Sequence, residues 1–360
     1  MGIDDLITVL AHYKLPSGDI SIKSIKGGRI NRTYKVITSS QLDNSESQFV
    51  LQMVNSSVFK KPELIMKNLD RLISYSKLKG LDLISTNEGE HWYKADDGSI
   101  YRLMKFVPNY PVASNNLNVC FQAGRAVGEF HRQYWKFPYE DLYEVIAGFH
   151  DTPSRFKYFD SILESTSPER LAQARLEIKF AIENNSLASL IIKKLVSGVI
   201  PWRVTHNDTK IDNVLFTSGG IAICLIDFDT VMAGAVAWDI GDAIRSLANN
   251  VAEEETNIEK VSFLYYRFYS YLKGYASVMD GVLEPAEVMS LSDGCIVIAY
   301  EQGLRFLTDY LNNDQYYDTS YPNQNLIRAR IQFELLRHML VQRKKMETAQ
   351  KELFPKTLSG

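Results

Sequence analysis

The chain has 360 residues, of which 45% are hydrophobic and 23% are charged, and its formal net charge is −3. This composition is typical of a globular protein that is long enough for two lobes. A slightly acidic chain without a block of basic residues lacks the electrostatic signature of proteins that bind nucleic acid or anionic membranes. We therefore expect neither a nucleic-acid nor a membrane partner.

The cysteines and the first residues narrow the class of protein further. Cys120, Cys224 and Cys295 are widely spaced, which favours neither a disulfide framework nor a zinc site. The opening segment MGIDDLITVL has two aspartates where a secretory signal needs positive charge. No apolar run approaches the roughly 20 residues of a membrane-spanning helix. We expect a cytoplasmic protein.

The first hundred residues show a mostly β-type pattern. Residues 20–37 alternate around a two-glycine turn, and 49–54 predict another strand. A proline at the start and a glycine at the end bound a helical pattern over 62–80. Residues 91–107 predict a second hairpin, with its turn at Asp97–Gly98.

The pattern becomes helical after Pro108. Short strands are expected only between about 202 and 230, while the helical patterns cover 117–134, 168–197, 257–280, 285–312 and 324–352. The fold class is therefore predicted to be α+β and bilobal. We expect a small β-rich lobe over residues 1–107 and a larger helical lobe over 108–360, joined by the proline-containing segment 107–116.

The segment from 202 to 230 carries the candidate chemistry. Two short apolar runs flank the turn Ser218–Gly220 and predict a hairpin whose open end brings Asp208, Asn213 and Asp227 to one cavity. The oxygens of Asn213 and Asp227 suit Mg²⁺, which shares its coordination with substrate phosphates. Asp208 is then placed to accept a hydroxyl proton, and Lys210 to neutralise a phosphoryl group. These are the groups that phosphoryl transfer requires.

The order of these residues resembles the catalytic and metal-binding loops of the protein-kinase-like fold. HND replaces the His-Arg-Asp of protein kinases, DFD replaces their Asp-Phe-Gly, and WDIGDAIR follows where they have Ala-Pro-Glu. This variant resembles the aminoglycoside phosphotransferase and choline kinase superfamily, which phosphorylates small molecules.

Four longer segments, which lie between residues 149 and 332, resemble the bacterial N-acetylhexosamine kinases: THNDTKIDNVLF, FHDTPSRF, LRFLTDYL and YPNQNLIRARIQ. That family transfers the γ-phosphoryl group of ATP to the anomeric hydroxyl of N-acetylglucosamine or N-acetylgalactosamine. The resemblance implies ATP and Mg²⁺ as cofactors, a small-molecule sugar as substrate, and direct in-line transfer that yields a sugar 1-phosphate.

The resemblance also implies roles for individual residues. Asp208 would be the catalytic base, Lys210 the catalytic cation, and Asn213 and Asp227 the metal ligands. The residues implied in nucleotide binding are Gly28, Asn31, Tyr34, Gln52, Met104, Lys105 and Val107, of which Lys105 and Val107 would offer backbone groups. The residues implied in sugar binding are Asp208, Arg305, Tyr316, Arg29 and Ser246.

One position departs from the protein-kinase pattern. Gln52 stands where a strand lysine pairs with a helix glutamate and binds the α- and β-phosphates. A neutral amide brings no charge, which puts that lysine–glutamate switch in doubt. Lys210, or an arginine in the glycine loop, would then supply the missing cation.

Several polar residues near these motifs have simpler interpretations. We expect His206 to be structural and Asp212 to be solvated, whereas Asp229 stays open between a solvated acid and a ligand to a second Mg²⁺. Asp239 and Asp242 should fix the catalytic loop by hydrogen bonds, and His150 with Asp151 should form a turn.

Two alternative functions also remain open. One is a kinase of another small alcohol, such as an aminoglycoside, choline, homoserine or a different sugar. The other is a pseudokinase that retains the fold for binding alone, which Gln52 motivates and the intact catalytic residues oppose.

Overall fold

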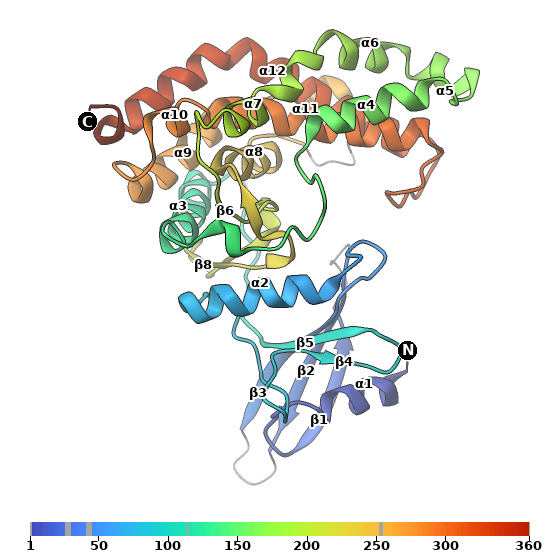
Figure 1. The fold of residues 1–360 in the computed structure, drawn as a ribbon, viewed down its shortest axis with the longest axis vertical. Coiled ribbons are helices and arrows are strands. Elements are labelled where there is room, and N and C mark those ends of the chain that lie inside the picture. The colour runs from blue at the N-terminus through green and yellow to red at the C-terminus, as the bar shows by residue number, and fades with distance from the viewer. Residues whose placement is uncertain (1, 26–29, 41–44, 114, 252–254, 360) are drawn as a thin grey trace. The chain divides into compact units, whose positions relative to one another are not determined.

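The computed structural model describes residues 2–25, 30–40, 45–113, 115–251 and 255–359. The chain divides into two compact units (Figure 1), which are treated separately below. The first unit comprises Met1–Tyr110, Glu140–Ala147 and Ile226–Met232, and the second comprises Pro111–Tyr139, Gly148–Leu225 and Ala233–Gly360. The lobe boundary after residue 107 stays a prediction.

The first unit is built on an antiparallel five-stranded sheet with the strand order β1-β2-β3-β5-β4 (Figure 1). Both predicted hairpins are present, although Gly27 and Gly28 lie outside the described residues. The elements of this unit are α1 (Ile3–Leu10), β1 (Asp19–Ser24), β2 (Arg32–Ser39), β3 (Glu46–Met53), α2 (Pro62–Tyr75), β4 (Tyr93–Lys94) and β5 (Ile100–Lys105).

One face of this sheet forms an apolar core. Val36 on β2 and Leu51 on β3 lie between more exposed neighbours, whereas Leu103 on β5 follows the buried Arg102, and all three apolar side chains are completely buried. Helix α1, which the sequence analysis did not predict, adds Leu6 and Leu10 to the same core. This packing fixes the register of the strands that carry Gln52 and Arg102.

Helix α2 attaches two distant segments to the first unit. It begins at Pro62 as expected but ends at Tyr75 because Ser76 is already extended. The buried side chain of Asn68 accepts the backbone N–H of Tyr143 at 2.8 Å and donates to the backbone oxygen of Val231 at 3.0 Å. This amide therefore holds the segment that contains Asp227 and Asp229 within the first unit.

The second unit is mainly helical, and the predicted α+β fold class is confirmed (Figure 1). The single pattern over 168–197 is broken into several short helices. The elements of this unit are α3 (Leu117–Gln133), α4 (Thr152–Leu163), α5 (Pro168–Gln173), α6 (Arg175–Glu183), α7 (Ile192–Val196), β6 (Arg203–Thr205), β7 (Val214–Phe216), β8 (Ala222–Leu225), β9 (Met232–Gly234, which begins in the first unit), α8 (Val236–Leu247), α9 (Tyr265–Met279), α10 (Pro285–Val288), α11 (Leu291–Leu311), α12 (Gln324–Leu353) and α13 (Pro355–Ser359).

The hairpin predicted around Ser218–Gly220 is formed by β7 and β8, with Val214 opposite Leu225. It leaves Asn213 directly before its first strand. Over the described ranges, no helix is both long and apolar enough to cross a membrane.

Helices α8 and α11 pack so closely that both need glycine at their contact. A Cβ atom on Gly294 would overlap the carbonyl oxygen of Ala237, and one on Gly241 would overlap the carbonyl oxygen of Gly294. Gly241 is the glycine of the WDIGD motif, so its role here is close helix packing. This contact sets the position of every side chain that α8 presents to the catalytic loop.

Substitution of Gly294 by Ala should lower the free energy of unfolding by about 1–3 kcal/mol, because an extra methyl group in a tight contact forces backbone shifts. Urea denaturation followed by circular dichroism would measure the change. Gly219→Ala is the matched control, since a Cβ there lies 3.8 Å from its nearest neighbour, the Thr217 hydroxyl. Equal effects of the two substitutions would contradict the packing argument.

Candidate active site

The loop between β6 and β7 holds Asp208 by one of its two carboxylate oxygens. Oδ2 of Asp208 accepts from Nζ of Lys210 at 2.6 Å and from Nδ2 of Asn213 at 2.9 Å. Nδ2 of Asn213 also donates to the backbone oxygen of Asp208 at 2.8 Å. Oδ1 of Asp208 is therefore the oxygen available to a substrate hydroxyl. The structure brings three predicted site residues together here.

Asn213 is oriented as a metal ligand should be. Because its Nδ2 is used by Asp208, its Oδ1 is the atom left for a cation. The described ranges contain no group of three or more His, Cys, Asp or Glu side chains arranged to hold a metal. A site built from Asn213 would therefore need few protein ligands, as Mg²⁺ sites shared with phosphates do.

The backbone of the catalytic loop is held by Asp239, which is completely buried on α8. Its carboxylate accepts the backbone N–H of His206 at 2.8 Å, the backbone N–H of Asn207 at 2.7 Å and Nε2 of His131 at 2.8 Å. The Thr209 hydroxyl donates to the Asp239 carbonyl oxygen. Asp239 thus fixes the loop as expected. Asp242 differs, because its carboxylate pairs with Arg245 at 2.9 Å instead.

Asn207, between His206 and Asp208, adopts a left-handed conformation with φ of 63°. Asparagine tolerates this region better than most residues, which gives a backbone reason for HND in place of His-Arg-Asp. A Cβ on Gly234 would collide with the Thr205 hydroxyl and lie 3.3 Å from Oδ1 of Asn207. The sequence analysis predicted neither the left-handed conformation of Asn207 nor the need for glycine at position 234, although Asn207 is part of HND.

His206 is structural, as expected. It is completely buried, and its Nδ1 lies 3.3 Å from the backbone nitrogen of Asp208, which donates to it. Asp212 is exposed, in line with the solvated interpretation. Neither side chain is placed as a catalytic group.

The first unit carries the second motif, DFD. Asp227 follows β8 by two residues and has φ of 67°, a left-handed conformation that is uncommon for aspartate and costs energy. Asp229 is almost fully buried and pairs with Arg102 of β5 at 2.5 Å. Asp229 also accepts Nδ2 of Asn31 at 2.6 Å. It is therefore not solvated, and Arg102 is a neighbour that the sequence analysis missed.

The other nucleotide-binding candidates lie along the sheet. Gln52 binds Arg102, and Tyr34 and Met104 are partly buried on β2 and β5. The backbone N–H of Lys105 donates to the oxygen of Asp82 at 2.9 Å, so that group is already used within the first unit. Val107 lies beyond the end of β5, and its role stays a prediction. Gly28 and Arg29 lie outside the described residues.

The predicted sugar-binding residues of the second unit lie on α8, on α11 and in the segment that follows α11. The Ser246 hydroxyl accepts the backbone N–H of Ile211 at 3.1 Å and donates to the Ala243 oxygen, so this residue supports the catalytic loop. Arg305 on α11 lies over the rings of Tyr317 and Phe149, 5.6 and 5.9 Å from their centroids. The structure thus adds Tyr317 and Phe149 to the predicted Arg305.

Tyr316 is 62% exposed, and its backbone N–H donates to Asp309 at 2.8 Å. Its ring meets the Tyr317 ring edge-on at 4.8 Å. Tyr316 is therefore an exposed side chain beside the half-buried Tyr317, and its contact with a sugar stays a prediction.

The FHDTP segment contains a helix cap and a buried pair. Asp151 caps α4 through the Ser154 N–H at 3.1 Å, so the expected turn is present. His150 lies 3.0 Å from Glu301, which also accepts the Thr152 hydroxyl at 2.5 Å. Because Glu301 lies 151 residues from His150, no local pattern could have indicated this pair.

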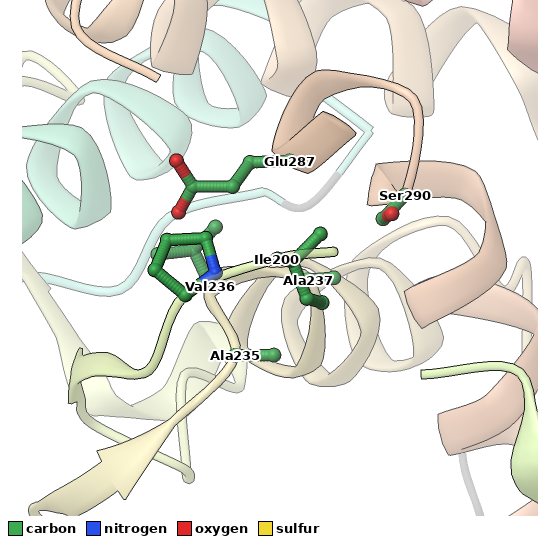
Figure 2. Close-up of a pocket in the computed structure, with 7 residues that line it drawn as sticks. Ile200, Ala235, Val236, Ala237, Glu287 and Ser290 are labelled. Atoms are coloured by element: carbon green, nitrogen blue, oxygen red, sulfur yellow. The ribbon is translucent and has the colours of Figure 1, made fainter. Parts of the chain in front are cut away.

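A small hollow elsewhere in the second unit lies against the start of α8 and the end of α10 (Figure 2). It is open to solvent, has no interior volume that would hold a water molecule, and contains none of the predicted site residues. Its lining is Ile200, Pro201, Ala235, Val236, Ala237, Glu287 and Ser290. The carboxylate of Glu287 is paired with Arg203 at 3.1 Å, so this hollow does not offer a free acid.

Solved structures support the same fold. A choline kinase from Cryptosporidium parvum is 14% identical, with 98% of each chain covered and a TM-score of 0.61. An aminoglycoside phosphotransferase from Alicyclobacillus acidocaldarius is 14% identical over 98% of this chain and 96% of the other, with a TM-score of 0.57. The GDP complex of aminoglycoside 2′-phosphotransferase-IIIa is 12% identical over 92% and 98% of the two chains, with a TM-score of 0.58.

At these identities the structures establish the fold alone. The sequence model of the phosphotransferase enzyme family matches residues 21–271, which include DFD, HND and all the candidate catalytic residues. Since this match covers more than half of the chain, the chain belongs to the phosphotransferase enzyme family.

Proposed function

We propose that this chain is an ATP- and Mg²⁺-dependent kinase that phosphorylates the anomeric hydroxyl of N-acetylglucosamine or N-acetylgalactosamine. The observation that carries the proposal is the state of Asp208, which has one oxygen held by Lys210 and Asn213 and the other available. Membership of the phosphotransferase family supports the type of reaction. The sugar is supported by the sequence resemblance and by the charge around Arg305.

Each of the proposed catalytic and metal-binding residues has a separate role in an in-line transfer. The sugar hydroxyl oxygen attacks the γ-phosphorus while the bond to the bridging oxygen of ADP breaks, and the hydroxyl proton passes to Oδ1 of Asp208. Lys210 offsets charge on the phosphoryl oxygens. Asn213 and Asp227 would hold Mg²⁺, which, when bound, neutralises the β- and γ-phosphate oxygens. Hydrogen bonds from Lys210 and Asn213 fix the direction in which Asp208 faces.

A purine nucleotide is the expected donor. The similar aminoglycoside 2′-phosphotransferase-IIIa was solved with GDP, which supports nucleotide use by this fold. Met104, Lys105 and Val107 remain the adenine-binding candidates, although Lys105 has only its backbone oxygen to offer, because its N–H is already bonded to Asp82.

The arginine side chains around Arg305 favour an acceptor that carries no positive charge. Burial first and the charge of Arg305 second lower the pKa of Arg155. Arg245 also acts against the charge of Arg305, although the pKa of Arg305 is raised overall, because Tyr317 and Glu301 outweigh burial and Arg245. Glu301 and Asp242 are the carboxylates paired with this arginine cluster, which leaves an excess of positive charge. An ammonium group would be repelled here, and a polyhydroxylated ring with an acetamido oxygen would be accepted. This disfavours choline and the aminoglycosides as acceptors.

One helix connects this cluster to the catalytic loop. Ser246 contacts Ile211 of the loop, and the adjacent Arg245 belongs to the cluster. Tyr317 and Phe149 beside Arg305 give aromatic surface on which a sugar ring can stack. The same helix α8 therefore supports both the base and the acceptor residues.

Substitution of Asp208 by Asn should lower kcat by about 10²–10⁴-fold, since the proton acceptor is lost while the shape is kept. MgADP binding, measured by isothermal titration calorimetry, should stay within about twofold, because no nucleotide contact is removed. Asp212→Asn, on the exposed neighbour, is the control. If the Asp208 variant retains a tenth of the wild-type activity, the assignment of the base is wrong.

A panel of acceptors tests the charge argument. ADP release should respond to N-acetylglucosamine or N-acetylgalactosamine and not to choline, ethanolamine or kanamycin. Arg305→Met should raise the KM for the sugar about tenfold or more and leave the KM for ATP within about twofold, because it removes acceptor binding alone. Arg337→Met, on a largely exposed arginine of α12, is the matched control. Turnover of choline without turnover of either sugar would overturn the proposal.

The ionisation of Glu301, beside the arginine cluster, makes the stability of the folded protein depend on pH in the acid range. Burial alone would raise its pKa, but the charges of His150, Arg155 and Arg305 and the His150 hydrogen bond outweigh this and lower the pKa from 4.5 to about 2. Between these values the unfolded chain binds more protons than the folded one. The stabilisation from Glu301 is therefore complete above about pH 5 and is lost as the pH falls towards 2.

Substitution of Glu301 by Gln should reduce stability at pH 7 by on the order of 2–3 kcal/mol, and the deficit should shrink as the pH falls below about 4.5. Urea midpoints of both proteins between pH 7 and pH 3 would measure it. Glu347→Gln, at a more exposed ion pair with Arg343, should change stability by less than about 0.5 kcal/mol. A deficit that is constant over the whole pH range would contradict the low pKa.

A further inference from the structure

Four side chains of the first unit form a continuous chain of hydrogen bonds and charge, which we call the Arg102 relay: Gln52, Arg102, Asp229 and Asn31. Oε1 of Gln52 accepts from Nε and Nη2 of Arg102 at 2.9 and 2.7 Å. Nη1 of Arg102 lies 2.5 Å from Oδ1 of Asp229. Oδ2 of Asp229 accepts Nδ2 of Asn31 at 2.6 Å.

The charged pair at the centre of the relay is almost entirely shielded from water, whereas Gln52 and Asn31 are partly buried. The side chains of Arg102 and Asp229 are 2% and 4% exposed. Charges at this depth are retained only when they are paired and hydrogen-bonded, because the cost of removing them from water is large. A side chain more than 120 residues away in sequence therefore determines where Asp229 sits.

Each end of the relay lies at a segment that we assign to the binding of the nucleotide or its metal ion. Oδ1 of Asn31 accepts the backbone N–H of Asn55 at 3.0 Å, so this side chain joins the start of β2 to the end of β3 as well as to Asp229. Asp229 lies two residues after Asp227, the proposed metal ligand, whose backbone is left-handed. The relay thus ties the segment carrying Asp227 to the strands of the sheet.

The relay gives a structural reason for glutamine at position 52. It lies opposite Arg102 in the β3–β5 register and opposite Thr33 in the β2–β3 register, and its Nε2 donates to the Thr33 hydroxyl at 3.3 Å. A lysine at 52 would bring a second cation against Arg102 and could not accept its two N–H groups. The neutral amide is therefore what a buried arginine at 102 requires.

We propose that Arg102 is a positioning residue for MgATP. It fixes Asp229, and through Asp229 it fixes Asn31 and the backbone of Asp227, in the role that a strand lysine paired with a helix glutamate has in protein kinases. Asp229 then acts through Arg102 and not as a ligand of a second Mg²⁺. The inference rests on the proposed function, since it assumes that MgATP is the donor.

A double-mutant cycle of Arg102→Met, Asp229→Asn and the combined variant tests the relay. Three measurements are needed for each protein: the thermal unfolding midpoint, the Kd for MgADP and the Kd for metal-free ADP. The single variants should be destabilised because each leaves a buried partner unpaired, and the combined variant should recover much of the midpoint because both charges are gone. Arg343→Met, which breaks an Arg–Asp pair in the second unit, controls for destabilisation alone.

If the relay positions the metal–nucleotide complex, all three variants should raise the Kd for MgADP by about 10–100-fold, the range typical of residues that orient a metal ligand. The combined variant should be no worse than the single ones, because they break one unit. The Kd for metal-free ADP should rise by clearly less than the Kd for MgADP, because it reports only the part of the relay that acts through Asn31. The KM for the sugar should change by less than about threefold, since it does not depend on the orientation of Asp227.

Three outcomes would overturn the relay. In the first, the combined variant regains both the midpoint and the wild-type Kd for MgADP, which means that the pair is only structural. In the second, Asp229→Asn weakens MgADP binding while Arg102→Met does not, which means that Asp229 binds the metal directly. In the third, none of the variants changes the Kd. Wild-type protein that binds no MgADP would instead refute the proposed function.

Discussion

The buried carboxylate of Asp239 is the group on which the catalytic loop depends. It accepts two successive backbone N–H groups, from His206 and Asn207, together with the imidazole of His131. Burial alone would raise its pKa, but the His131 hydrogen bond and the neighbouring imidazoles outweigh this, and the pKa lies below the usual range. A charge that is paired in this way holds Asn207 in its left-handed conformation and so aims Asp208.

Helix packing determines where that carboxylate lies. Asp239 is two residues before Gly241, at the point where α8 and α11 approach so closely that glycine is required on both helices. One turn further along α8, Arg245 meets the charge of Arg305 from α11, and Ser246 supports Ile211. The proposed base and the arginine cluster are therefore both positioned by α8: Asp239 within WDIGDAIR binds the backbone of the loop, and Ser246, which follows this segment, binds Ile211.

The loop residues could be predicted from the sequence because their chemistry is local. Asp208, Lys210 and Asn213 lie within six positions, and the hairpin that follows them consists of two short apolar runs on either side of a glycine turn. Arg102 and Glu301 could not be found in this way, since each meets its partner across more than a hundred residues and no periodicity records such a pair. The short helix α1 was missed for a related reason, because its helical character depends on packing against the sheet.

The Arg102 relay bears on how such a kinase would be controlled. A switch needs two arrangements that differ by a few kcal/mol, and an exposed lysine–glutamate pair can be made and broken at that cost. Separation of Arg102 from Asp229 would leave two buried charges without an opposite charge beside them, since Gln52 and Asn31 are neutral, and this costs far more. The pair should therefore persist whether or not nucleotide is bound. The segment that carries Asp227, the proposed metal ligand, therefore has no second arrangement of comparable energy for a switch to select.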